Sequence, residues 1–134
     1  MDQPFPAPSS FLHPSGEMSH IAIERVRPSH PTFPPMLVHT VYFWLKPELT
    51  TAQRADFRRG VESLGGIKAV EKIYVGAPAK TEKRPIIDDS YAVALTVLCK
   101  DVAAHDAYQV DPIHLAFINQ FKTFWNRVQI YDAE

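Results

Sequence analysis

The chain of 134 residues is long enough for one domain with a single hydrophobic core, and too short for two domains of ordinary size. Its net charge of -1, without any run of Lys or Arg, argues against nucleic acid as a partner. The single cysteine lies in an apolar run, so no internal disulfide is expected. No apolar stretch approaches the length of about 18 residues that a membrane span needs, and the N-terminus does not resemble a secretory signal. Together these features predict a cytoplasmic protein without membrane contacts.

The N-terminal part of the chain differs sharply in composition from the rest. Eight of the twelve prolines precede Met36, and proline fixes its own φ and biases the preceding residue to extended conformations. We therefore divide the chain into a flexible Pro-rich extension over residues 1–35 and a folded domain over residues 36–134, with Met36 as the expected natural start. Within the extension, Ile21 and Ile23 are spaced for one face of a short strand that could dock on a sheet edge, which is the alternative interpretation.

The segment Leu37–Leu45 is rich in β-branched and aromatic residues and predicts a strand. Strand alternation places His39 with Val41 and Phe43 on one face, and Tyr42 with Trp44 on the other. Both faces are apolar, although a sheet covered by helices on one side needs only one apolar face. The second face therefore predicts a further layer, which in so short a chain would come from a second copy.

The middle of the domain reads as a helix followed by two strands. A capping box at Thr50–Gln53 begins a helix that continues to about Leu64, where Gly65–Gly66 is expected to end it with a left-handed turn. Strands are predicted over residues 68–75 and 91–99. The charged stretch between them is interpreted as a surface loop, with an active-site lid as the alternative.

The last part of the domain predicts two helical segments and a strand. Asp101 is placed to cap a short helix through Tyr108, and Asp111, followed by proline, to cap a helix that runs to about Phe124. A strand follows over residues 127–132. The order strand, helix, strand, strand, helix, strand predicts an α+β, ferredoxin-like βαββαβ fold, with an antiparallel four-stranded sheet and the helices on one face.

Two histidines and a tyrosine form the candidate site. His39 lies on the face that helices should cover, and a buried imidazole needs hydrogen-bond partners, which Tyr108, Asp111 or His114 could supply. Imidazole exchanges protons near pH 7 and a tyrosine hydroxyl can stabilise an enolate, so His114 and Tyr108 are candidate catalytic residues for proton abstraction beside a carbonyl. By the phase of its helix, His105 is expected to face away from this group.

Two alternative interpretations of these residues stay open. In the first, they are ordinary core residues, with Asp111 acting only as a helix cap. In the second, His39, Asp111 and His114 are ligands of a metal ion, since two imidazoles and a carboxylate make a plausible site. The spacing of these residues matches no metal-binding motif, so no metal and no cofactor is assigned.

Four segments carry a resemblance to a known family: Val38–Lys46, Val75–Gly76, Ala107–Phe117 and Phe124–Asp132. In their order and spacing they resemble the stress-responsive A/B barrel family, known as Dabb. Its members are small ferredoxin-like proteins that pair into a dimeric α/β barrel. The resemblance begins at Met36 and implies that the folded domain is a Dabb domain.

The resemblance implies a homodimer of unassigned activity, with a pocket for a small apolar or aromatic ligand between sheet and helices. We take His39, Tyr108, Asp111 and His114 as the candidate ligand-binding residues. The family includes a plant polyketide cyclase in which a histidine and a tyrosine matching His114 and Tyr108 carry the chemistry, and similar barrels include cofactor-free monooxygenases. The alternative function is therefore a cofactor-free enzyme, cyclase-like or monooxygenase-like, with His114 as base, Tyr108 as oxyanion partner and His39 as orienting residue.

Three positions depart from the patterns of these relatives. Val61 and Val93 stand where the cyclase has a pocket tyrosine and a histidine, and Asp111-Pro112 replaces the usual His-Pro of the family. These departures argue against the substrate of the cyclase as the substrate of this chain.

Overall fold

The computed structural model describes residues 36–134. The predicted Pro-rich extension, with its alternative short strand, lies outside the described residues. None of the helices between residues 36 and 134 has the length and apolar character that crossing a membrane requires.

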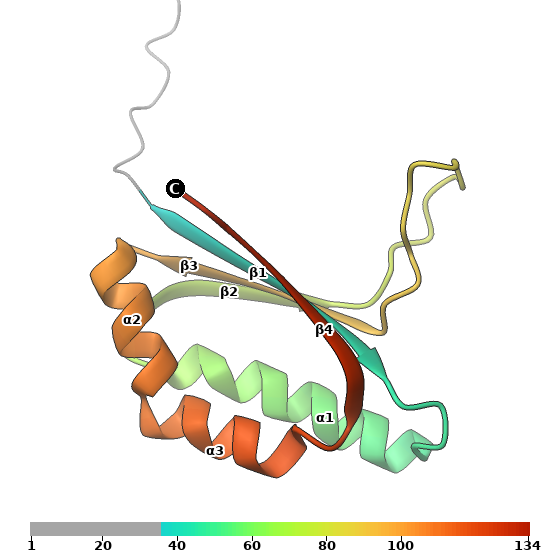
Figure 1. Ribbon diagram of the computed structural model, residues 1–134, viewed down its shortest axis with the longest axis horizontal. Helices are drawn as coiled ribbons and strands as arrows, with labels where there is room; N and C mark the ends of the chain where they lie inside the picture. Colours follow the sequence, from blue (N-terminus) through green and yellow to red (C-terminus); the bar gives the residue numbers. More distant parts are fainter. Residues whose placement is uncertain (1–35) are drawn as a thin grey trace, which may run out of the picture. The chain divides into compact units, whose positions relative to one another are not determined.

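The sheet contains four strands in the order β2-β3-β1-β4, and all neighbouring strands are antiparallel. All three α-helices lie on the same side of this sheet (Figure 1). This is the predicted ferredoxin-like βαββαβ arrangement, with the second helical region divided in two. The elements in chain order are β1 (Leu37–Leu45), α1 (Thr51–Ser63), a 3₁₀ turn (Leu64–Gly66), β2 (Val70–Gly76), β3 (Val93–Cys99), α2 (Val102–Val110), α3 (Pro112–Phe121) and β4 (Trp125–Ala133).

The core lies between the helices and the face of β1 that carries His39. Val41 and Phe43 on this face are buried, and so are the neighbouring side chains of β3 that alternate from Val93 to Cys99. Phe57 of α1 packs edge-on against Phe43, with ring centroids 5.2 Å apart. The alternation expected from the sequence of β1 therefore places one side of this strand in the core.

The ends of the helices confirm some of the predicted caps and correct one. Thr50 forms the expected capping box with Gln53, in which each side chain meets a free backbone N–H group of the other residue. The prediction of a left-handed turn at Gly65–Gly66 is wrong, because no glycine from residue 36 onward has a positive φ. The chain instead tightens into the 3₁₀ turn after Ser63, a common way to end a helix.

The chain leaves α3 earlier than predicted because it has to turn back into the sheet. The N–H of Phe124 donates to the carbonyl of Phe121, and the carbonyl of Phe124 accepts from the N–H of Lys46 at 2.9 Å. These two bonds join the end of α3 to the end of β1. As a result β4 begins at Trp125, two residues before the predicted strand.

The other face of the sheet is covered by no element among residues 36–134 (Figure 1). It carries a broad aromatic depression of about 290 Å³ that includes Tyr42, Trp44 and Tyr131. Tyr42 packs against Tyr91 with ring centroids 4.9 Å apart, and the Arg127 guanidinium lies 4.1 Å from the centre of the Trp44 ring. The aromatic second face expected from the sequence is therefore present, and its covering layer stays a prediction.

Gly60 allows α1 to pack closely on α3. A Cβ atom at this position would clash with Cε2 of Phe121 and lie 2.8 Å from its Cζ. Phe121 is buried and wedged against Phe57 and Phe124, so its ring has little room to move.

We expect Gly60→Ala to lower the free energy of unfolding by roughly 1–3 kcal/mol, because the added methyl group overpacks the core. This loss should appear although alanine favours a helix by about 1 kcal/mol over glycine. Urea denaturation followed by circular dichroism measures it. Gly66→Ala is the matched control, since its Cβ would meet only Ile113 Cδ1, at 3.9 Å. Equal effects of the two substitutions would contradict this account.

Candidate functional site

A cavity of about 130 Å³ lies between the sheet and the helices. Its polar lining consists of His39, Tyr108, Gln109 and His114. The rest is apolar and includes Val41, Phe43, Phe117, Trp125, Val128 and Ile130. An apolar cavity of about 150 Å³ can bind benzene, so this one has room for roughly one small ring.

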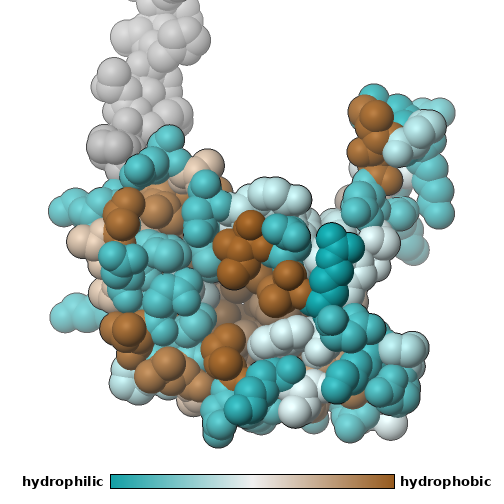
Figure 2. Space-filling model, in the orientation of Figure 1, coloured by the Kyte–Doolittle hydropathy of each residue, from teal (hydrophilic) through white to brown (hydrophobic). Residues whose placement is uncertain are grey.

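The cavity reaches solvent beside β4. Val128 and Ile130 line the cavity and are nevertheless 40% and 45% exposed, so they belong to both its wall and the molecular surface. Figure 2 shows hydrophobic residues gathered around a hollow on this face of the molecule. A small molecule can therefore reach the polar groups past an apolar rim.

His39 is buried, with 2% of its surface exposed. Its Nδ1 lies 2.5 Å from Oδ1 of Asp132, which is directly opposite on β4. An ionised carboxylate only accepts hydrogen bonds, so His39 Nδ1 donates and Nε2 is the basic nitrogen of the neutral ring. Burial lowers the pKa of His39; the bond to Asp132 works against this shift, and His105 adds to it.

Tyr108 projects from α2 into the core, with its ring edge-on to His39 at 5.7 Å between centroids. Burial raises the pKa of Tyr108 far above its ordinary value. The hydroxyl therefore keeps its proton at neutral pH. It can donate a hydrogen bond to an oxygen atom in the cavity, and it cannot serve as a base there.

His114 lies in the first turn of α3, with its ring centroid 4.8 Å from that of Tyr108. Its Nδ1 is buried and has no hydrogen-bond partner among residues 36–134. Burial is the main cause that lowers the pKa of His114, and the backbone of Gln109 offsets part of the shift. Buried polar atoms without a partner are uncommon in native proteins, so this nitrogen is a natural binding point for a ligand.

The structure brings His39, Tyr108 and His114 together as the sequence indicated. Asp111 is placed differently: its carboxylate accepts a hydrogen bond from the N–H of Ile113 at 2.8 Å and caps α3. It does not line the cavity. The alternative metal site of His39, Asp111 and His114 is therefore not assembled, since Asp111 serves the helix end.

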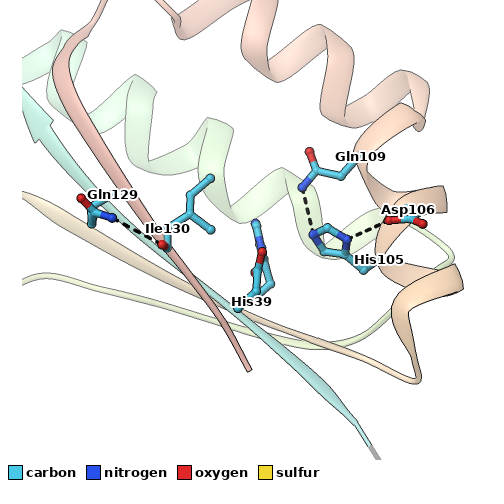
Figure 3. Close-up of polar contacts among 7 residues, drawn as sticks. His39, His105, Asp106, Gln109, Gln129 and Ile130 are labelled. Carbon is cyan, nitrogen blue, oxygen red and sulfur yellow. Dashed lines mark hydrogen bonds and ion pairs between the residues drawn. The ribbon is translucent and has the colours of Figure 1, made fainter. Parts of the chain in front are cut away.

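The expectation that His105 faces away from this group is wrong. His105 and His39 reach toward each other from α2 and β1, with ring centroids 4.9 Å apart (Figure 3). The sequence held a signal for this, because His105 and Tyr108 are three residues apart and share a helix face. Asp132 was also missed, although strand alternation places it on the same face as Ile130.

Comparisons with known proteins give a family and a fold. The family model described as Stress responsive A/B Barrel Domain matches residues 37–134. Olivetolic acid cyclase from Cannabis sativa is 24% identical over 95 residues, which cover 70% of this chain and 91% of the cyclase. Hydroxynitrile lyase from Passiflora edulis has a similar structure, with a TM-score of 0.64 and 17% identity over 75% of this chain and 94% of the lyase.

Two solved structures of bacterial proteins also resemble the structure of this chain. A Dabb family protein from Mesorhizobium loti has a TM-score of 0.60 and 24% identity, covering 74% of this chain and 95% of its own. A dimeric ferredoxin-like protein of unknown function from Thermobifida fusca has a TM-score of 0.60 and 16% identity, covering 73% of this chain and 89% of its own. At these identities the likenesses to solved structures show the fold alone.

We expect His114 to make folding stability depend on pH. Because its folded pKa lies below the ordinary value of 6.5, the unfolded chain takes up a proton here at higher pH than the folded protein. The free energy of unfolding should therefore fall as the pH drops through 6.5 toward the folded pKa, and stay unaffected by this group at higher pH. Urea denaturation at several pH values should show a shallower pH dependence for His114→Gln, and parallel curves would contradict the prediction.

Proposed function

Since the chain belongs to the stress-responsive A/B barrel domain family, we propose that it is a homodimer whose cavity between sheet and helices binds a small aromatic or apolar molecule. The observation that carries this proposal is the buried, unpartnered Nδ1 of His114 in a cavity that is otherwise mostly apolar. A ligand that bonds this nitrogen and fills the apolar space would satisfy both features of the site.

The cavity restricts the chemistry and the size of the ligand. Its volume of about 130 Å³ lies below the range of about 300–1,000 Å³ that is usual for drug-sized ligands. Tyr108 supplies a hydroxyl donor, and neutral His114 supplies a ring nitrogen beside it. One aromatic ring with one phenolic hydroxyl or carbonyl oxygen therefore fits best, as in phenol or benzaldehyde.

We expect phenol and benzaldehyde to shift the imidazole NMR signals of His114. Tyr108→Phe should weaken binding roughly 3- to 10-fold, which corresponds to the loss of one hydrogen bond. Phe117→Trp should abolish binding, because its larger ring would occupy the cavity. Leu115→Ala is the control on α3, since Leu115 is exposed and lies outside the cavity lining. An unchanged His114 signal at millimolar ligand would contradict the proposal.

A second candidate is a cofactor-free enzyme, favoured by the protonated Tyr108 hydroxyl beside the neutral ring of His114. In this function His114 takes a proton from the substrate, Tyr108 donates a hydrogen bond to the oxygen that gains charge, and His39 orients the substrate. Two of the relatives carry enzyme names, a cyclase and a lyase, which supports this candidate.

An activity assay separates the two candidate functions. If the wild-type protein converts an aromatic cyanohydrin or a small β-diketone, and both Tyr108→Phe and His114→Gln lose this activity, the protein is an enzyme. Binding of these compounds without their conversion would favour the first candidate, a binding protein.

The homodimer is supported by the aromatic face of the sheet that residues 36–134 leave uncovered. Tyrosine, tryptophan and arginine are enriched where proteins contact each other, and this face carries Tyr42, Trp44, Tyr131 and Arg127. The Thermobifida fusca protein, which shares this fold, is described as dimeric. A second copy that packs its sheet on this face would supply the missing layer.

We expect Thr40→Glu to dissociate the dimer. Thr40 alternates with Tyr42 on the uncovered face, so the substitution places a carboxylate in water in a monomer and in a buried interface, without a planned partner, in a dimer. Sedimentation should show a dissociation constant raised by roughly 100-fold or more. Leu115→Glu, on the exposed surface of α3, should leave the dimer intact. A monomeric wild-type protein, or a Thr40→Glu dimer of unchanged affinity, would refute the proposal.

A further inference from the structure

Three side chains from different elements converge next to the ligand cavity. They are His39 of β1, His105 of α2 and Asp132 of β4. One ligand atom from each lies within 4.8 Å of the other two, and no other group of three such side chains occurs among residues 36–134. We propose that these residues bind a divalent transition-metal cation such as Zn²⁺ or Co²⁺.

The donor atoms select this class of cation. Two imidazole nitrogens and one carboxylate oxygen suit zinc, cobalt and iron, whereas Mg²⁺ and Ca²⁺ prefer oxygen ligands throughout. Ligand atoms around tetrahedral zinc lie roughly 3.3 Å apart. His39 Nδ1 and Asp132 Oδ1 are 2.5 Å apart, and the three ligand atoms all lie within 4.8 Å of one another. When the ion binds, His39 Nδ1 releases to solvent the proton that it donates to Asp132 in the metal-free protein. Small side-chain adjustments are enough to close the site around an ion.

A cation can reach the site from solvent. An open depression of about 300 Å³ on the surface includes His105 and Asp132 in its lining, and His39 lines the inner cavity. Asp106 and Glu134 also line the depression, and their negative charges favour a cation there. The ion would lie where the depression meets the cavity. With three ligands from the protein, a fourth position stays free for water or for an oxygen of a bound molecule.

The neighbours of His105 already hold its ring in place. Asp106 Oδ1 lies 3.2 Å from Nδ1, and Gln109 Nε2 lies 3.2 Å from Nε2 (Figure 3). Metal-bound histidines usually donate a hydrogen bond from the N–H of their other ring nitrogen to a carboxylate in this way. The ion takes Nε2 in place of the Gln109 amide, while Asp106 keeps the proton on Nδ1.

Titration of the full-length, tag-free chain with Co²⁺ tests this site, because the visible absorption of Co²⁺ reports ligand type and geometry. We expect one equivalent to bind and Zn²⁺ to displace it, while Mg²⁺ does not. His105→Gln and Asp132→Asn should each weaken Co²⁺ binding by at least roughly 100-fold. Circular dichroism of both variants checks that they remain folded.

The three histidines near the N-terminus require their own control. A variant with His13, His20 and His30 all replaced by Gln should bind Co²⁺ like the wild-type chain. Loss of binding in this variant, wild-type affinity in folded His105→Gln or Asp132→Asn, or no Co²⁺ binding by the wild-type chain would each overturn the proposal.

Discussion

An unpaired imidazole nitrogen in the core is costly, and the way in which His39 avoids this cost shapes the whole site. Leaving its nitrogen unpaired in the core would cost about 1–3 kcal/mol. Asp132 supplies the acceptor only because β4 pairs with β1 in the register that sets the two residues opposite each other. A slip of one residue would turn Asp132 to the uncovered face of the sheet. The strand register and the polar end of the cavity therefore depend on each other.

The fold was predictable where local chemistry decides it. Alternation along β1 and the capping box at Thr50 needed no distant partner, and both appear as expected. The end of α3 depends instead on the backbone bond between Phe124 and Lys46, which no local pattern reveals. Gly65–Gly66 shows a different limit: glycine permits a left-handed turn without requiring one, and the chain adopts a 3₁₀ turn there.

The residues of the candidate site likewise include some that local sequence patterns reveal and some that depend on distant contacts. Tyr108 and His114 lie on either side of the Asp111-Pro112 break between two helices, which is visible in the sequence, and the structure places both on the cavity that His39 lines. Asp132 contacts His39 across 93 residues of sequence, so its role depends on strand pairing that one short pattern cannot supply. Asp111 was ambiguous because a carboxylate that precedes a helix can either bind a ligand or accept hydrogen bonds from the free N–H groups of the first turn. In the structure it accepts from the N–H of Ile113 and caps the helix.

The pairing of β1 with β4 also has a kinetic consequence. It joins the first and last strands of the domain, and closing so long a loop costs entropy before any contact forms, so such pairings form late in folding. As an edge strand, β4 has only one neighbour in the sheet, and most of its residues are exposed. Local opening is easiest in segments of this kind. We therefore expect β4, which carries Val128 and Ile130 of the cavity wall, to open before β1 and β3.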